Sequence, residues 1–265
     1  MKIVVCAKQV PDTTEVRLDP KTNTLIRDGV PSIINPDDKA GIEAALQLKE
    51  KCPESTVTVV SMGPPQADVA LREALAMGCD EAVLISDRAF GGADTWATSS
   101  TIAAALKKLD YDVIITGRQA IDGDTAQVGP QIAEHLGIPQ VSYAERIELK
   151  DEHTLRIQRQ FEDRYHIINV KMPCLVTALA ELAQPRYMSV GGIVEAYDEK
   201  KVKVWGLADL EDTLDTANIG LKGSPTRVKK SFTKQAKGAG AILKDASPEE
   251  AVEAIVAKLK EKHII

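Results

Sequence analysis

Short apolar runs alternate with longer amphipathic segments along the first 180 residues. Runs rich in Val and Ile predict buried strands, and they cover residues 2–10, 55–61, 81–86, 112–117 and 174–178. The segments between them carry apolar residues at helical spacing and predict helices over residues 37–51, 64–78, 95–109 and 128–137. Strands separated by helices are typical of a parallel sheet with crossover connections. The predicted fold is therefore α/β, with a Rossmann-like parallel sheet.

Residues at the predicted helix ends agree with these boundaries. Asn35 followed by Pro36 is expected to cap the first helix and to set its first turn. Gly78 and Gly137 stand where helices commonly end on a left-handed residue. Because Pro130 has no amide hydrogen, we expect either a loose first turn in the last of these helices or a regular start near residue 129.

The pattern changes beyond residue 140. Segments 142–150, 153–161 and 164–172 predict consecutive antiparallel strands beside the parallel set. After residue 190 the periodicity is weak until a capping-box sequence, S-P-E-E, opens a final amphipathic helix. We expect a nucleotide-binding domain over residues 1–190 and an extended arm over residues 191–265. An arm that wraps a partner subunit explains this composition, and docking on its own domain is the alternative.

The charge balance limits the classes of partner. The chain has 265 residues with 33 Lys and Arg against 39 Asp and Glu, a formal net charge of -6 and a pI near 5.4. Such a chain lacks the usual electrostatic attraction to nucleic acid or to an anionic membrane. Neither a signal-peptide core nor an apolar run of membrane-spanning length is present. We expect no nucleic-acid partner, no membrane insertion and a cytoplasmic location.

The reactive side chains do not form a recognisable catalytic set. The acidic pair Asp37 and Asp38 follows a helix-starting Pro, so first-turn helix charges are a better interpretation than an acid/base pair. No general base or nucleophile stands out, and a cofactor is expected to supply the chemistry. We expect reduced thiols and no metal site, because no C-x-x-C pair or nearby His accompanies the cysteines, Cys6, Cys52, Cys79 and Cys174.

The loop after the fourth predicted strand carries most of the candidate binding chemistry. It runs from Gly117 to Pro130 and leads from a strand end into a helix, where open α/β folds bind ligands. Gly117 and Gly123 allow a ligand close to the backbone, and amides of residues 124–128 are suited to phosphate oxygens. The alternative is an Asp-Gly turn that caps the helix without any ligand.

No common nucleotide motif accompanies this loop. The chain has neither G-x-x-x-x-G-K-[ST] nor G-x-G-x-x-G after its first strand. A nucleotide would instead lie across the ends of the first and fourth predicted strands, with its adenine and ribose near residues 6–7, residues 35–38 and Met62. The candidate cofactor-binding residues are Cys6, Ala7, Asn35, Pro36, Asp37, Asp38, Met62, Gly117, Gln119, Asp122, Gly123, Asp124, Thr125, Ala126, Gln127 and Val128.

Several longer stretches resemble one protein family. They are VVCAKQV, INPDDKAGIEAALQLKE, VSMGPPQADVALREALAMG, TGRQAIDGDTAQVGPQIAEHLG, PCLVTALAELAQPRYMSV and the segment from KGAG to the last helix. Together they resemble the beta-subunit family of electron transfer flavoproteins over nearly the whole chain. The signature of that family falls on residues 157–177, where Arg164 and His166 depart from it and leave the subfamily in question. The matching positions are Arg159, Glu162, Asp163, Ile168, Pro173, Leu175, Val176 and Thr177.

The resemblance implies a fold of the adenine nucleotide alpha-hydrolase-like kind and an obligate heterodimer with an alpha subunit that carries FAD. It also implies an adenine-nucleotide site in this chain, which holds structural AMP in simple carriers and a second FAD in the NADH-dependent electron-bifurcating group. Gly123 replaces an acidic residue of the AMP-binding relatives, and the stretches VPDTTEV, GDTAQVGP and PRYMSVGG resemble the bifurcating group. These features favour FAD.

In the bifurcating group, the FAD takes hydride from NADH. One electron then goes to ferredoxin or flavodoxin, and the other goes through the alpha-subunit FAD to an acyl-CoA dehydrogenase. Such a chain acts as an NADH-dependent flavin oxidoreductase only within that complex. The resemblance places partner docking on Tyr187, Met188, Ser189, Val190 and Gly191.

Two alternatives stay open. The first is a non-bifurcating carrier subunit with AMP, which passes electrons between dehydrogenases and a downstream acceptor. The second is a stand-alone adenine-nucleotide-binding sensor with the same α/β core. For the docking residues, an ordinary surface turn is the alternative.

Overall fold

The computed structural model of the chain describes residues 1–12, 31–229, 238, 240 and 242–265. These residues form two compact units, Met1–Val228 and Lys229–Ile265. The end of the VPDTTEV stretch, residues 13–16, and residues 237 and 239 of KGAG lie outside the described residues.

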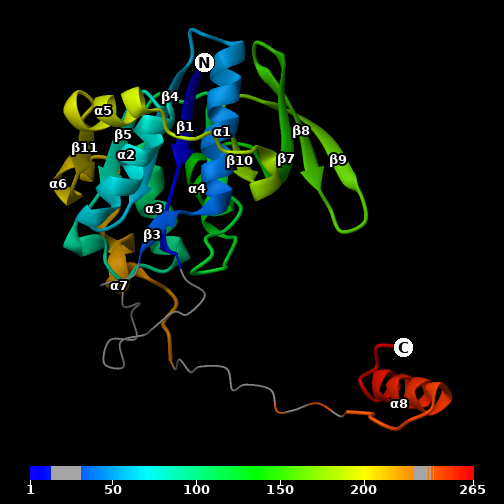
Figure 1. The fold of residues 1–265 in the computed structure, drawn as a ribbon. Coiled ribbons are helices and arrows are strands. Elements are labelled where there is room, and N and C mark those ends of the chain that lie inside the picture. The colour runs from blue at the N-terminus through cyan, green and yellow to red at the C-terminus, as the bar shows by residue number, and fades with distance from the viewer. Residues whose placement is uncertain (13–30, 230–237, 239, 241) are drawn as a thin grey trace. The chain divides into compact units, whose positions relative to one another are not determined.

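A mostly parallel sheet forms the centre of the first unit (Figure 1). Within the described residues it has nine strands in the order β11-β5-β4-β1-β6-β10-β7-β8-β9. Pairing is parallel from β11 to β7 and antiparallel from β7 to β9. The bounds are β1 Lys2–Cys6, β4 Thr56–Met62, β5 Glu81–Ile85, β6 Val113–Gly117, β7 Gln140–Asp151, β8 Thr154–Gln160, β9 Tyr165–Lys171, β10 Cys174–Ala178 and β11 Val202–Trp205.

Helices cover both faces of this sheet. Side chains alternate along β1, so Ile3 and Val5 join the core beneath one helical layer and Val4 joins the core beneath the other. The first layer is α1 Pro36–Lys51, α2 Asp68–Met77 and α5 Val190–Asp198, and the second is α3 Thr95–Leu106, α4 Val128–Leu136 and α6 Leu207–Leu210. Short helical turns are η1 Pro65–Ala67, η2 Arg88–Phe90, η3 Ala180–Leu182, η4 Thr216–Asn218 and α7 Gly220–Gly223.

The strand order confirms the predicted Rossmann-like α/β class. The central order β5-β4-β1-β6 is that of one mononucleotide-binding half of a Rossmann fold. After β5, the chain crosses back over β1 and adds β6 on the other side of it. The direction of winding therefore reverses between β1 and β6. A crevice is expected at the carboxyl ends of those two strands.

Local departures from the predicted elements have identifiable causes. The predicted strand over residues 2–10 divides, because β1 ends at Cys6 and β2 Gln9–Pro11 turns away to pair antiparallel with β3 Ser32–Ile34. The helix predicted from residue 64 begins later, as the turn η1, because Pro65 restricts Pro64 before it to extended backbone. The antiparallel strands beyond residue 140 are confirmed as β7, β8 and β9.

The predicted helix ends are mostly confirmed. Gly78 and Gly137 both adopt positive φ, 126° and 66°, directly after α2 and α4. The helix α4 begins at Val128, so Pro130 lies in the first turn, where no helical amide bond is required. Asn35 occupies the predicted N-cap position and Pro36 opens α1, but the Asn35 side chain makes no capping hydrogen bond.

Residues 191–228 fold onto the α/β core. The strand β11 pairs with the edge strand β5, and Ala196 and Leu210 are fully buried. The compact unit therefore ends at Val228, whereas the sequence pattern placed the boundary after residue 190. A four-residue strand and single buried positions are too short to produce a recognisable hydrophobic period.

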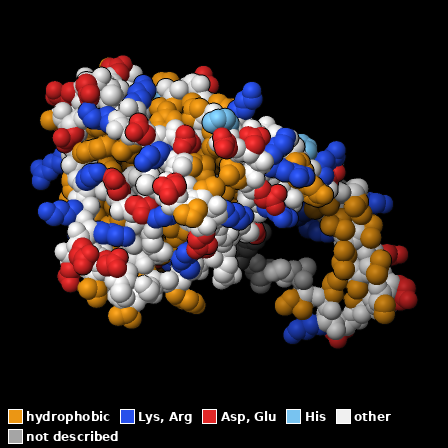
Figure 2. All heavy atoms as spheres, turned by 90° about the horizontal axis from the view of Figure 1, so that it is seen from above, with side chains coloured by type: hydrophobic (Ala, Val, Ile, Leu, Met, Phe, Trp, Pro, Cys, Tyr) orange, Lys and Arg blue, Asp and Glu red, His pale blue; other side chains and the backbone are white. Residues whose placement is uncertain are grey.

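The second unit contains the predicted amphipathic helix. This is α8, Pro248–Glu261, and Ser247 and Glu250 form the expected reciprocal capping box. Val252 and Ile255 on this helix are exposed. Among the described residues, no helix is both long and apolar enough to cross a bilayer. Figure 2 shows acidic and basic side chains interspersed over the face seen from above.

Candidate functional site

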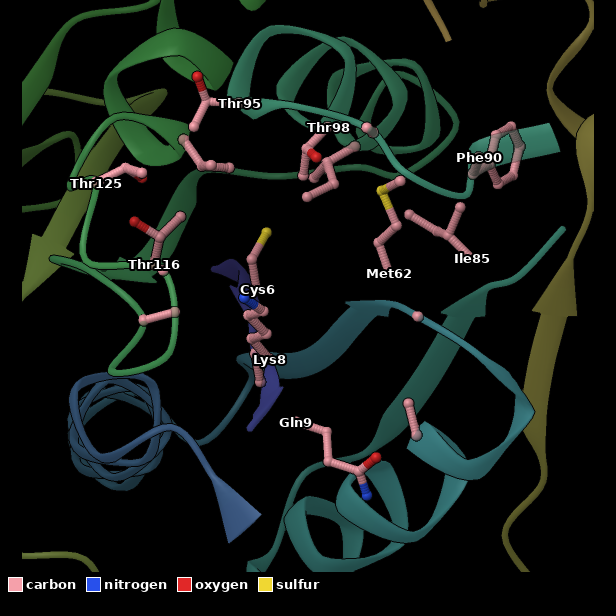
Figure 3. A pocket seen from close by; sticks show the side chains of 18 of the residues that line it. Cys6, Lys8, Gln9, Met62, Ile85, Phe90, Thr95, Thr98, Thr116 and Thr125 are labelled. Atoms are coloured by element: carbon pink, nitrogen blue, oxygen red, sulfur yellow. The ribbon is translucent and has the colours of Figure 1, made fainter. Parts of the chain in front are cut away.

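A cleft of about 1220 Å³ opens at the carboxyl ends of the central strands. Cys6 of β1, Met62 of β4 and Thr116 of β6 line its floor, and Thr98 of α3 lines its roof. Figure 3 shows the side chains of Cys6, Met62 and Thr98 directed into one space. The position agrees with the crevice expected where the sheet winding reverses.

The loop from β6 to α4 forms one wall of the cleft and has an irregular backbone. Asp124 and Ala126 adopt left-handed φ values of 54° and 53°, which are uncommon for residues other than glycine. Within the described residues, the main-chain amides of Thr125 to Gly129 have no hydrogen-bond acceptor, and we call them the open amides. The amide of Asp124, predicted to be free, instead donates to the Ala120 carbonyl at 2.8 Å. Open amides at a helix N-terminus attract anions.

Side chains from three other elements hold this loop in place. The side-chain Nδ2 of Asn35 donates to the Gln119 carbonyl at 2.8 Å, and its Oδ1 accepts from the Ile121 main-chain amide at 3.0 Å. Lys8 forms an ion pair with Asp122 at 2.7 Å. At the far end of the loop, the Thr95 hydroxyl donates to the Gln127 side chain at 2.9 Å. The buried Asn35 therefore tethers the loop instead of capping α1.

Glycine is required at two positions beside the cleft and not at a third. A Cβ atom at Gly117 would lie 2.1 Å from the Asp38 carboxylate, and one at Gly129 would lie 2.5 Å from the Thr116 hydroxyl. No atom lies within 4 Å of a Cβ placed at Gly123, which faces the cleft. Gly117 and Gly129 permit close packing within the fold, whereas Gly123 keeps space open for a ligand.

Asp38 joins the ends of the two central strands. Its carboxylate accepts hydrogen bonds from the Lys8 amide at 2.7 Å and the Gly117 amide at 2.8 Å. Burial raises the pKa of Asp38 to about 7, against the lowering effect of these bonds. The neighbouring Asp37 lies outside the cleft, 3.5 Å from the Arg118 guanidinium, and burial raises its pKa as well. Asp38 is thus a structural bridge in the cleft wall.

The thiol in the cleft is unreactive at neutral pH. Burial, with a smaller contribution from the Asp38 carboxylate, raises the pKa of Cys6 to about 12. Because the thiolate is the nucleophilic form, Cys6 presents only a small apolar surface to a ligand. The other three cysteines are also free thiols. Among the described residues, no group of three or more His, Cys, Asp or Glu side chains is placed to hold a metal.

The structure brings most of the predicted cofactor residues together. Those that line the cleft are Cys6, Ala7, Asp38, Met62, Gly117, Gln119, Gly123, Asp124, Thr125, Ala126, Gln127 and Val128. The remaining four lie behind it. Asn35 and Asp122 support the loop, Pro36 starts α1 and Asp37 contacts Arg118.

The sequence pattern did not indicate the opposite wall. It includes Ile85 at the end of β5, the residues Arg88 and Phe90 of η2, and Thr226 near the end of the first unit. The only available signal was topological, because β5 must end at the same edge of the sheet as β1 and β6. Thr226 is held there by two hydrogen bonds to the Asp94 carboxylate, at 2.9 and 2.7 Å.

A second candidate surface, residues 187–191, lies where the chain enters α5, and we call it the docking segment. Tyr187 is 98% exposed and Val190 is 81% exposed. Ser189 caps α5 by accepting a hydrogen bond from the Gly192 amide at 2.9 Å. Large apolar side chains that stand in solvent on an ordered segment are typical of a protein contact.

The chain combines three features of nucleotide-binding α/β proteins: a Rossmann-type sheet, a cleft at its winding reversal and open amides at a helix start. Residues 22–210 match the family described as Electron transfer flavoprotein domain. The chain belongs to this family, as an electron-transfer subunit of the beta type.

Curated relatives match along their whole length. The chain is 62% identical to "Electron transfer flavoprotein subunit beta" of Clostridium acetobutylicum, with all of both chains covered. It is 55% identical to "Caffeyl-CoA reductase-Etf complex subunit CarD" of Acetobacterium woodii and 50% identical to "Acryloyl-CoA reductase electron transfer subunit gamma" of Anaerotignum propionicum, again over the full chains. Membership implies flavin-related electron transfer, an alpha-subunit partner and a dehydrogenase.

Proposed function

We propose that this chain is the beta subunit of an obligate heterodimeric electron transfer flavoprotein and that its cleft binds FAD. The residues of the cleft would hold the FAD, which would supply hydride uptake from NADH and separate transfer of the two electrons, one to ferredoxin or flavodoxin and one through the alpha-subunit FAD to an acyl-CoA dehydrogenase. The proposal depends on the row of open amides at the start of α4. These amides follow Gly123, where the space that a side chain would fill is empty.

The residues around the cleft suit a dinucleotide. The open amides and the dipole of α4 favour the negative diphosphate, and the absence of a side chain at Gly123 lets it approach the backbone. The partly exposed Met62 side chain is available for ring packing. The cleft of about 1220 Å³ exceeds the usual range of roughly 300–1,000 Å³ for small-molecule sites, which supports FAD over the smaller AMP.

Strain in the loop also supports a ligand at this position. Left-handed backbone at Asp124 and Ala126 costs on the order of 1–2 kcal/mol for each residue. Such conformations persist where the surrounding structure enforces them, and they concentrate at ligand sites. Here Asn35, Lys8 and Thr95 enforce the loop shape.

The proposed protein partners occupy two other parts of the chain. The docking segment contacts the acyl-CoA dehydrogenase, and Val190 is the apolar anchor. Two relatives are named as electron-transfer parts of CoA-reductase systems, which supports a dehydrogenase of CoA esters as the partner. The arm that leads to α8 binds the alpha subunit, where the exposed Val252 and Ile255 become buried.

The first experiment measures the ligands of the purified heterodimer. Denaturation and chromatography of the extract should give two flavins per heterodimer and no AMP. One flavin plus AMP would refute the FAD assignment and identify a non-bifurcating carrier. A chain that folds alone and binds ATP without an alpha subunit would instead be a nucleotide sensor.

The second experiment measures NADH oxidation by the holo heterodimer. Fast oxidation should require both the dehydrogenase with its acyl-CoA ester and the low-potential acceptor. For each electron that reduces the ester, one electron should reduce ferredoxin. Equal rates with the dehydrogenase alone would refute bifurcation while leaving FAD binding intact.

A further inference from the structure

Arg186 lies directly before the docking segment and is bound to α1 by several charged hydrogen bonds. Its guanidinium contacts both carboxylate oxygens of Glu43, with Nε to Oε2 at 2.7 Å and Nη2 to Oε1 at 2.9 Å. The Arg186 main-chain amide donates to the same carboxylate at 3.1 Å. A further guanidinium nitrogen contacts Glu50 at 2.8 Å. The backbone and the side chain of Arg186 are therefore fixed to one helix.

The Glu43 carboxylate is a buried partner, with its side chain 5% exposed. Burial alone would raise the pKa of Glu43, but the hydrogen bonds from Arg186 and from the Gln47 amide outweigh it and hold the pKa below its ordinary range. Glu43 therefore stays ionised at neutral pH. A planar guanidinium matches a carboxylate in this two-point geometry, whereas a lysine ammonium does not.

The other end of the docking segment is also anchored. Ser189 caps α5, and a Cβ at Gly192 would lie 2.4 Å from the Ala76 carbonyl of α2. Ala196, one turn further on, is fully buried, and the Arg72 side chain donates to its carbonyl at 2.5 Å. The exposed side chains of Tyr187, Met188 and Val190 lie between these anchors.

We propose that Glu43 and Arg186 form a positioning clamp that sets the docking segment in the geometry in which it meets the dehydrogenase. This proposal rests on the docking function proposed above. A segment held at both ends loses less conformational entropy when a partner binds, so the clamp lowers the concentration of heterodimer that docking requires. Arg186 acts here through its neighbours, because its charge is already neutralised by Glu43 and Glu50.

The test uses the holo heterodimer as the varied substrate of an acyl-CoA dehydrogenase from the same organism. A saturated acyl-CoA ester serves as the electron donor, so the assay runs the dehydrogenase opposite to the proposed direction of electron flow. Flavin reduction is followed, and KM for the heterodimer is separated from kcat. Arg186→Met should raise KM about tenfold with kcat within twofold of wild type and with unchanged flavin content. Arg186→Lys should recover only part of the loss, because it keeps the charge without the two-point geometry.

Matched variants separate the clamp from other effects. Lys203→Met removes an exposed ion pair with Glu81 elsewhere on the first unit and should leave KM unchanged. Glu43→Gln should raise KM as Arg186→Met does, whereas Glu50→Gln, at the exposed end of the clamp, should have a smaller effect. If Arg186→Met does not express as a folded heterodimer, Glu43→Gln and Arg186→Lys carry the test.

The outcomes distinguish the clamp from the docking function. An unchanged KM in Arg186→Met, together with a raised KM in Val190→Ser, would overturn the clamp and leave docking intact. An unchanged KM in both variants would overturn docking on this segment, and the clamp with it. Full recovery by Arg186→Lys would show that charge alone matters and would also overturn the clamp.

Discussion

Two loops of this molecule lead into helices. They differ in whether the residues around them provide hydrogen-bond partners for their main-chain amides. The loop between β6 and α4 has left-handed backbone at Asp124 and Ala126 and presents the open amides to a cleft. The docking segment has a side-chain cap at Ser189 and two-point anchoring at Arg186. Its exposed groups are apolar side chains, chiefly Tyr187 and Val190.

The difference indicates what each loop binds. Open amides at a helix start are completed by an anion, so the first loop is suited to a small, negatively charged ligand. The docking segment is already anchored by hydrogen bonds, and its exposed side chains are apolar. Burying these side chains against another protein is energetically favourable. The helix α1 supports both loops, with Asn35 just before it holding the first and Glu43 holding the second.

The largest expected effect comes from the glycine that the first loop needs for its fold. Gly117→Ala would place a methyl group against the Asp38 carboxylate and should lower the free energy of unfolding by about 3 kcal/mol. Gly123→Ala, in open space, should change it by less than about 0.5 kcal/mol. Urea denaturation of both variants measures this contrast. Equal losses would show that the cleft is not packed as described.

The pH dependence of stability should have opposite signs in the two regions. The pKa of Asp38 is raised to about 7 from its usual 3.8, so the folded chain holds a proton there that the unfolded chain releases. Its contribution is therefore fully present below about pH 4 and is lost as the pH rises toward 7. The pKa of Glu43 is lowered, so its contribution is present above its usual 4.5 and is lost as the pH falls further.

Denaturation at several pH values tests these signs. Asp38→Asn should flatten the decline between pH 5 and pH 7, because that variant has no proton to lose there. Glu43→Gln should leave that decline unchanged and should weaken the loss of stability below pH 4.5. If Asp38→Asn keeps the wild-type slope between pH 5 and pH 7, another group accounts for it.

A negative charge at the open glycine should act on the ligand without affecting the fold. Gly123→Asp should weaken FAD binding about 30-fold, equivalent to about 2 kcal/mol, because a carboxylate would face the diphosphate. Gly123→Asn adds nearly the same volume without charge and should weaken binding much less. Gly191→Asp is the matched change in the docking segment, where space is also open, and should leave FAD binding unchanged. Titration of flavin-stripped heterodimer gives the three affinities.

The smallest expected effect concerns the strained alanine. Ala126→Gly relieves a left-handed alanine but makes the unfolded chain more flexible, and these effects nearly cancel. The free energy of unfolding should stay within about 0.5 kcal/mol of wild type. Ala133→Gly in the buried interior of α4 should cost about 1 kcal/mol. A comparable loss in Ala126→Gly would indicate that residue 126 is not left-handed.

Much of the fold could be predicted because its signals are local. Five of the parallel strands, β1, β4, β5, β6 and β10, are short apolar runs, and Gly78 and Gly137 mark helix ends that the structure confirms. The strand β11 was not predicted, because VKVW is only four residues long and its lysine is typical of a surface loop. Its place is decided by pairing with the edge of β5, which no local pattern encodes.

The floor of the cleft and one of its walls were predictable from the sequence, and the facing wall was not. The β6–α4 loop is contiguous in sequence, so its glycines and its place before a helix could be recognised together. The facing wall draws Ile85, Phe90 and Thr226 from separate segments, and only the tertiary fold assembles them. Asn35 shows a related limit, since a residue that suits a helix cap can equally bond a loop more than 80 positions away.

The most direct test of the account is amide hydrogen exchange of the heterodimer, measured in the flavin-stripped form and again after FAD is restored. FAD should slow the exchange of amides 125–129 and leave the docking segment, residues 187–191, unchanged. Full FAD occupancy with unaltered exchange at residues 125–129 would contradict the claim that these amides hold the diphosphate.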